Sequence, residues 1–327
     1  MGLRGSVGPL CAGLFYMDRW KSLWEVVEGH MPGRRLTALQ TPEIVGVYRT
    51  MCERMVCFVA CKTPSEIAAV AVKAGVAKSR ASATALVVLG FLGGSFVAMA
   101  AVASHTVSCS LGIWAGPSAV RLISGMVFSV GIVMVIVGGA ELFTGNSLMV
   151  MALLDRRIRS GELIRNWVIV YFANMAGAIF VAWLYYETEL WQPIDGACAQ
   201  ALITTAIRKS SIHFWPAFFR GALCNWLVCM GVWMSYSADD AVGRVVPLSM
   251  AESSFVMCGA EHSVANMFYM PVGLMVSSTP LAEWLAGFGR NLVPVTLGNI
   301  VGGGLLVAVM YWWAYMRPVS EMGDRVL

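Results

Sequence analysis

The sequence predicts an all-α membrane protein with six transmembrane helices in two inverted repeats, the second and fifth helices being broken near the membrane midplane. Composition is the first observation, because 58% of the 327 residues are hydrophobic and only 13% are charged, with a mean hydropathy of +0.69. A soluble domain of this length carries more charge to cover its surface. The other two observations are a series of long apolar stretches and a short polar segment that occurs twice.

The apolar stretches are each long enough for a transmembrane helix, which needs roughly 20 residues per crossing. Short segments rich in charged or turn-forming residues separate them and mark the expected loops. In chain order the predicted spans are Ala81–Ser104, Leu122–Leu154, Asn166–Tyr186, Ile212–Ala238, Val245–Ser277 and Asn291–Tyr315.

The residues that flank these spans are predicted to lie outside the bilayer. Residues 1–65 form a cytoplasmic extension, and its first six residues match an N-myristoylation pattern. In Pro64–Arg80, alanines and valines alternate with Glu and Lys, which is typical of an amphipathic helix on the membrane surface. Residues 66–317 then form the six-helix membrane domain, and residues 318–327 form a short cytoplasmic tail.

Lysine and arginine positions orient the chain, because cytoplasmic loops carry an excess of both. They are frequent before the first span, in Asp155–Arg159 and after the last span. They are sparse in the intervening loops, which are 105–120, 187–209 and 278–290. With six crossings both termini are cytoplasmic, and the protein is predicted to be a multi-pass protein of the plasma membrane.

Charge and cysteine content exclude two classes of protein. A formal charge of +4, scattered along the chain, gives no footprint for nucleic acid. Nine cysteines without paired spacing give no disulfide framework. Cys109 and Cys198 both fall on the predicted outer side, and the sequence leaves open whether they pair.

The duplicated polar segment is Gly139–Asn146 in the second span and Gly259–Asn266 in the fifth. Both read Gly-Ala-Glu, then four residues, then Asn. Ionisable groups are costly in a bilayer and usually functional there, and glycine lets the backbone leave helical geometry. The segments therefore predict paired helix breaks that face each other across a pathway. In each break the carboxylate, Glu141 or Glu261, is expected to accept the exposed backbone N–H groups.

A second repeat relates the third span to the sixth. Residues 165–177 and 290–302 share Arg, Asn, Val, Val, Asn and Gly at six of thirteen positions. With the predicted topology, one copy starts at the inner face and the other at the outer face. Such an inverted repeat places a functional site near the midplane, where the two halves meet.

The residues alone leave several interpretations open. An isolated membrane histidine such as His262 can be a packing residue, and Lys78 and Lys209 can be interfacial anchors. An intramembrane enzyme could use Glu261 and His262 as acid and base, but no nucleophile motif or cofactor signature accompanies them. A water channel of aquaporin type would carry an Asn-Pro-Ala pair, which this sequence lacks. A non-transporting subunit would not need two polar breaks.

Four segments of the chain resemble signatures of the formate/nitrite transporter family: Leu142–Asn146, Cys224–Cys229, Glu261–Met267 and Asn291–Asn299. The resemblance covers about residues 66 to 317. It implies an aquaporin-like fold, a homopentamer with one pore per protomer, and passage of small monocarboxylates or similar weak-acid anions. It implies neither an enzyme nor a cofactor. The N-terminal extension suggests the lactate–proton branch of protozoan parasites.

The resemblance also assigns roles to individual residues. It makes His262 the central histidine, with Thr144 as its partner across the pore and Asn174 and Asn299 as paired polar groups facing the pore. Two residues would occupy the vestibules, Lys78 on the cytoplasmic side and Lys209 on the outer side. Five residues stand where the family builds two apolar constrictions: Phe128, Ile132, Leu142, Val228 and Phe255.

The sequence departs from the family pattern at Glu252, where an apolar residue is usual, and Arg220 is a second unusual charge within a span. Either residue could alter selectivity or face a neighbouring protomer. The preferred anion stays open among formate, lactate, pyruvate, nitrite and hydrosulfide. Whether His262 or water supplies a proton to that anion also stays open.

Overall fold

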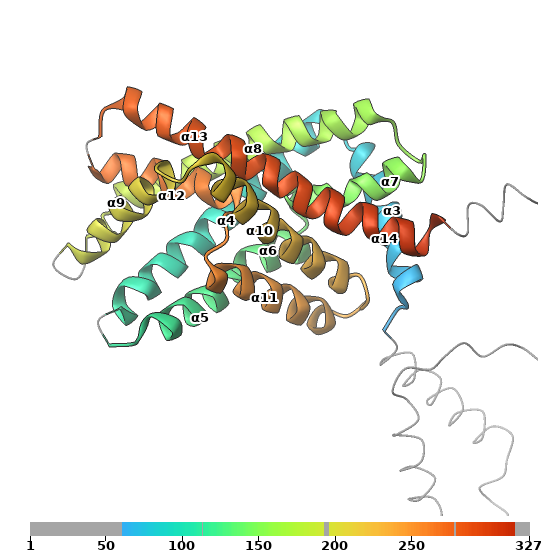
Figure 1. The fold of residues 1–327 in the computed structure, drawn as a ribbon, viewed down its shortest axis with the longest axis horizontal. Coiled ribbons are helices and arrows are strands. Elements are labelled where there is room, and N and C mark those ends of the chain that lie inside the picture. The colour runs from blue at the N-terminus through green and yellow to red at the C-terminus, as the bar shows by residue number, and fades with distance from the viewer. Residues whose placement is uncertain (1–60, 113, 193–195, 278, 318–327) are drawn as a thin grey trace, which may run out of the picture. The chain divides into compact units, whose positions relative to one another are not determined.

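The computed structural model describes residues 61–112, 114–192, 196–277 and 279–317. Most of the predicted N-terminal extension, its N-myristoylation pattern and the predicted tail from 318 to 327 lie outside these ranges. Within the described residues, all regular secondary structure is helical (Figure 1). The helices are α3 (Pro64–Ser79), α4 (Ala83–Leu111), α5 (Pro117–Phe128), α6 (Val130–Gly138), η1 (Gly145–Met149), α7 (Val150–Leu154), α8 (Ser160–Glu187), α9 (Ala197–Ser210), α10 (Phe214–Ser235), α11 (Ala241–Cys258), α12 (Ser263–Ser277), α13 (Leu281–Ile300), η2 (Val301–Val309) and α14 (Met310–Tyr315).

Five helical stretches in the described residues are long and apolar enough to cross a membrane. They are Ala83–Leu111, Pro117–Gly138, Ser160–Glu187, Phe214–Ser235 and Leu281–Tyr315. The predicted fifth span is divided between α11 and α12, and neither is among the five. Two shorter apolar helices, Gly145–Leu154 and Ser263–Ser277, follow the two polar loops.

Close helix packing organises the domain in two corresponding pairs. Helix α4 packs along α8, and α10 packs along α13. In each pair a glycine allows the backbones to touch. A Cβ on Gly94 would overlap the backbone of Asn174, and a Cβ on Gly298 would overlap the carbonyl of Phe218. Small residues that let helices approach are the usual device in membrane domains, where burial from water does not drive helix association.

Helix α3 coincides with the helix predicted over residues 64 to 80. Thr63 and Glu66 form a capping box at its start, with Pro64 in the first turn. Its apolar side, including Ile67, Ala68 and Ala71, is buried, and the helix packs on η1 and α7. The apolar side of α3 is therefore covered by other helices of the protein.

The structure differs from the prediction in three of the loops. The loop expected at 105–120 contains the end of α4 at Leu111 and the start of α5 at Pro117. The loop expected at 187–209 contains α9, whose residues Cys198, Leu202, Ala206 and Lys209 are buried at helical spacing. The loop expected at 278–290 contains the start of α13 at Leu281. Helix α9 buries only one stripe of residues, so no continuous apolar run marks it in the sequence.

Candidate functional site

Two loops with the same backbone path lie at the centre of the candidate site. Helix α6 ends at Gly139, which has the left-handed conformation (φ 80°), and α11 ends at Gly259 with φ 71°. The next residue donates its N–H to the last turn of the preceding helix in both cases, Ala140 to Val135 at 2.9 Å and Ala260 to Phe255 at 3.1 Å. Glycine at this position is the common way to end a helix.

Each loop then presents a carboxylate that is ion-paired with a lysine. Glu141 Oε1 lies 2.8 Å from Lys78 Nζ of α3, and Glu261 Oε2 lies 2.8 Å from Lys209 Nζ of α9. Asn146 donates to Glu141 Oε2 at 2.7 Å, and Asn266 donates to Glu261 Oε2 at the same distance.

A second asparagine completes the polar network of each loop. Asn146 also donates to Asn166 Oδ1 at 2.8 Å, and Asn166 donates to the backbone carbonyl of Lys78 at 3.3 Å. The other loop repeats this arrangement through its own four residues, which are Lys209, Glu261, Asn266 and Asn291. Each lysine is thus connected to its loop twice, through its side chain and through its own carbonyl.

Asn174 and Asn299 hold the loop backbones from the neighbouring helices. Asn174 accepts the N–H of Phe143 at 2.9 Å and donates to the carbonyls of Gly90 and Glu141. Asn299 accepts the N–H of Ser263 at 3.0 Å and donates to the carbonyls of Gly221 and Glu261. Both side chains are fully buried. The side-chain amides of Asn174 and Asn299 therefore form hydrogen bonds with backbone groups. Their predicted contact with a permeating anion stays a prediction.

The two loops meet through Thr144 and His262. Thr144 Oγ1 lies 3.0 Å from His262 Nε2, and both residues are buried. His262 Nδ1 accepts the backbone N–H of Ala265 at 3.1 Å, in the first turn of α12. Because Nδ1 acts as an acceptor, the proton of the neutral imidazole lies on Nε2, which donates to Thr144. The hydroxyl proton of Thr144 is left for another acceptor.

Apolar side chains enclose this polar contact. The ring of Phe255 stacks on His262 at 5.8 Å between centroids, and Phe128 meets Phe255 edge-on at 5.7 Å. The other predicted constriction residues, Ile132, Leu142 and Val228, are also buried. The structure thus brings the Phe128–Phe255 pair directly to the histidine.

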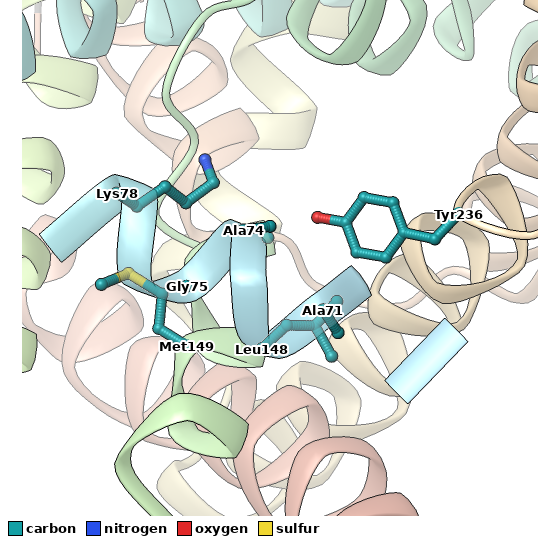
Figure 2. Close-up of a pocket in the computed structure, with 8 residues that line it drawn as sticks. Ala71, Ala74, Gly75, Lys78, Leu148, Met149 and Tyr236 are labelled. Atoms are coloured by element: carbon teal, nitrogen blue, oxygen red, sulfur yellow. The ribbon is translucent and has the colours of Figure 1, made fainter. Parts of the chain in front are cut away.

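A small pocket approaches the loops from the side of Lys78. Its walls include Lys78, Ile132 and Leu142, so a cation and two predicted constriction residues line the same cavity. Tyr236 lines this pocket and an adjacent one, where Figure 2 shows its hydroxyl extending toward the space beside Lys78. Lys209 is more enclosed, since only 9% of its side chain is exposed, against 25% for Lys78.

Some residues of this network were not singled out by the sequence. Asn225 of α10 donates to the carbonyls of Thr144 and Asn299 at 3.1 and 2.6 Å, and so ties the two halves together. The sequence did show that Asn225 is a polar amide within an apolar helix, which is a pattern typical of a functional position. Asn166 and Asn291 were visible as matched positions of the 165–177 and 290–302 repeat. Their partners were not visible, because each bond joins distant segments.

Comparison with known proteins assigns the family. The sequence profile described as "Formate/nitrite transporter" matches residues 65–313. The chain belongs to the formate/nitrite transporter family. Together with the long apolar helices, this membership makes it a multi-pass membrane protein, and the relatives below are transporters and channels rather than enzymes.

Three relatives illustrate the range of this formate/nitrite transporter family. The chain is 36% identical to a probable formate transporter of Methanothermobacter thermautotrophicus, over 78% of this chain and 98% of the relative. It is 34% identical to the formate channel FocA of Escherichia coli K12, over 78% and 94%. It is 31% identical to the nitrite transporter NirC of the same strain, over 72% and 85%.

Solved structures of the family share the fold. A structure described as an FNT family ion channel has a TM-score of 0.68 at 28% identity, covering 76% of this chain and 98% of that one. A pentameric formate channel with formate bound has a TM-score of 0.63 at 30% identity, covering 72% and 98%.

Proposed function

We propose that this member of the formate/nitrite transporter family carries small monocarboxylates of the formate, lactate and pyruvate type together with a proton. The anion is neutralised in a vestibule and crosses the apolar part of the pore as the acid. The contact between Thr144 and His262 inside an apolar enclosure carries this proposal. It provides one polar group in a proposed pore whose other walls favour an uncharged solute.

Magnitudes favour the neutral acid over the bare anion. A carboxylic acid with a pKa of about 4 requires roughly 4 kcal/mol to be protonated at neutral pH. Moving the anion into an apolar constriction without a partner approaches a Born limit of tens of kcal/mol. Protonation is therefore the cheaper route past Phe128, Phe255 and Leu142.

The lysines are proposed to attract the anion before it is protonated. Lys78 lines the open pocket, and its pairing with Glu141 leaves a quarter of its side chain exposed. Lys209 has the corresponding role on the other side, where it is more deeply enclosed by Glu261. Because His262 Nε2 donates to Thr144, the Thr144 hydroxyl can then donate its own hydrogen bond to an oxygen of the guest. Protonation of His262 at Nδ1 would first have to break its bond to Ala265.

The proposed architecture is a six-helix transport domain of aquaporin-like type in residues 66–317. In it, α5 to α7 and α11 to α12 each form one span, interrupted by a polar loop. The pentameric formate channel among the similar structures supports a homopentamer. Both termini are proposed to be cytoplasmic and the protein to reside in the plasma membrane, following the distribution of Lys and Arg.

A nitrite-type anion channel is the second candidate, favoured by the similarity to NirC. A weak-acid guest with the same charge and a similar size would use the same lysines and the same central pair. Competition for uptake among formate, lactate, pyruvate, nitrite and hydrosulfide separates the two candidates.

Proteoliposomes that contain a pH dye test the proposal. An inward lactate or formate gradient should acidify the lumen at a rate that rises as the external pH falls, without generating a membrane potential. Empty liposomes give the background from passive acid entry. Electrogenic passage of the bare anion, or osmotic swelling without acidification, would contradict the proposal.

A further inference from the structure

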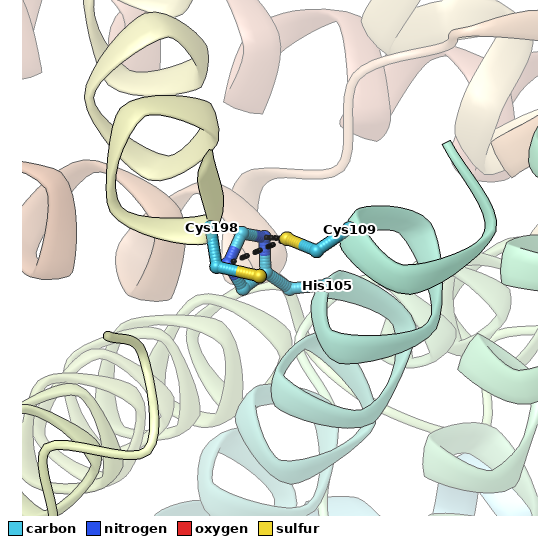
Figure 3. Close-up of side chains that lie close together, drawn as sticks. All are labelled: His105, Cys109 and Cys198. Atoms are coloured by element: carbon cyan, nitrogen blue, oxygen red, sulfur yellow. Dashed lines mark hydrogen bonds between the residues drawn. The ribbon is translucent and has the colours of Figure 1, made fainter. Parts of the chain in front are cut away.

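Outside the candidate pore, three side chains that can ligate a metal converge where α4 ends and α9 begins. His105 and Cys109 belong to α4, and Cys198 is the second residue of α9 (Figure 3). Their ligand atoms all lie within 4.8 Å of one another. His105 and Cys198 are buried, and Cys109 is partly exposed.

The geometry of this cluster suits a tetrahedral metal ion. His105 and Cys109 are four residues apart, so they lie on one face of α4. Cys109 Sγ lies 3.4 Å from His105 Nε2. Around Zn²⁺, ligand bonds of about 2.0 to 2.3 Å place a sulfur and a nitrogen roughly 3.6 Å apart and two sulfurs roughly 3.8 Å apart. The separation of Cys109 Sγ and His105 Nε2 is already close to the first of these values, and all three ligand atoms lie within 4.8 Å of one another.

We infer that His105, Cys109 and Cys198 form a Zn²⁺ site that fixes α9 to the end of α4. Two thiolates and a neutral imidazole make the zinc complex neutral, which matters because an uncompensated charge is costly in a buried position. A Cu⁺ ion with the same ligands would leave one negative charge. Three protein ligands leave the fourth position to a water molecule, as in other Cys₂His zinc sites.

The surroundings of the cluster would let an ion enter and hold two helices together. The ring of Tyr185 packs edge-on against His105 with centroids 6.5 Å apart and closes one side of the site. The partly exposed Cys109 leaves a route for the metal to enter. Helix α9 also carries Lys209, so an ion at Cys198 would hold the helix that positions the ion pair with Glu261.

Metal content of the purified full-length protein tests this inference. The protein in detergent is reduced, stripped of metal with a chelator, incubated with Zn²⁺ and desalted. Zinc per protomer is then measured by inductively coupled plasma mass spectrometry. Wild-type protein should retain about one Zn²⁺ per protomer more than each of C109S, C198S and H105A. The matched control is C258S, which removes an exposed cysteine of α11 and should retain the wild-type amount.

A spectrum of the wild-type protein keeps the test independent of variant folding. Co²⁺ in place of Zn²⁺ should give thiolate-to-metal charge-transfer absorption that C109S and C198S lose. Equal zinc content in wild type and all three variants would overturn the inference, since any metal would then be bound elsewhere. A disulfide between Cys109 and Cys198 in protein purified without reductant would also overturn it, because the site would then be a covalent crosslink.

Discussion

The loop at Gly139–Asn146 and the loop at Gly259–Asn266 are held by corresponding bonds but present different side chains to each other. Glu141 matches Glu261 in its lysine and asparagine partners, and the backbone clamps from Asn174 and Asn299 match bond for bond. The differences lie between these anchors. His262 stands where the first loop has Leu142, and Val264 stands where the first loop has Thr144.

This comparison separates scaffold from function. Residues that fix the loop backbone are kept in both copies, because each copy must satisfy the same exposed N–H and C=O groups inside an apolar domain. Residues that face the other loop are free to differ, and the single imidazole and single hydroxyl form one contact between the two loops. The two loops therefore differ at the residues through which they contact each other.

Loss of the carboxylate should affect the second half more than the first. Glu261→Gln leaves Lys209 as an unpaired charge with 9% of its side chain exposed, and we expect about 3–5 kcal/mol of destabilisation. Glu141→Gln should cost about 1 kcal/mol, because water reaches a quarter of the Lys78 side chain. Thermal unfolding of the purified protein compares the two variants. Adding Lys209→Met to Glu261→Gln should recover part of the loss, and equal effects of the two single variants would contradict the difference in enclosure.

The asparagine clamps should instead behave alike. Asn174→Ala and Asn299→Ala each leave one N–H and one carbonyl of a loop without this partner, and each also removes the bond to a helix carbonyl, that of Gly90 in α4 or of Gly221 in α10. We expect about 3 kcal/mol for each, since a buried unsatisfied polar group costs about 1–3 kcal/mol and water can reach some of them. The same unfolding measurement checks this. A large effect of one variant beside a negligible effect of the other would show that the two scaffolds are not equivalent.

Sequence reasoning located the apolar stretches and both loops because these features are local. A run of some 20 apolar residues or a repeated Gly-Ala-Glu segment can be seen without knowing the fold. The pairings could not be derived in this way. Lys78 and Glu141 are 63 positions apart and Lys209 and Glu261 are 52 apart, so the sequence suggested vestibule lysines and loop carboxylates as separate groups.

The expected pairing of Thr144 with His262 came from the resemblance to the family rather than from the residues. Helix α9 was missed for a physical reason, because a helix that buries one stripe has no continuous apolar run. The cluster of His105, Cys109 and Cys198 was not predicted either, because Cys198 belongs to α9. The sequence raised only the question whether Cys109 and Cys198, both on the predicted outer side, form a pair.

The contact between the loops should be functional, with only a small effect on stability. Thr144→Val and His262→Leu each replace the residue by the type that its counterpart in the other loop has, and each removes the bond between Oγ1 and Nε2. We expect each to lower lactate or formate uptake at least about tenfold, or about 1.4 kcal/mol in barrier height. His262→Leu also removes the cap on Ala265, at about 1 kcal/mol of stability.

Uptake by the double variant distinguishes a functional pair from two separate residues. If the pair acts as a unit, the double variant should lose no more activity than either single variant. Multiplicative losses would mean that Thr144 and His262 act independently. An unchanged rate and pH profile in His262→Leu would leave the histidine only a role as a spacer and helix cap.

The smallest expected effect concerns the two glycines at which the loops begin. Gly139 and Gly259 have positive φ angles, and a Cβ on either would meet no atom within 4 Å, so substitution by alanine introduces backbone strain alone. We expect about 1–2 kcal/mol for each variant, measured by thermal unfolding. Gly145→Ala is the matched control, because its Cβ would also meet open space, its φ is not positive, and the second loop already has Ala265 there. It should be neutral or slightly stabilising, and a loss at Gly145 as large as at Gly139 would mean that the first loop needs flexibility that the second does not.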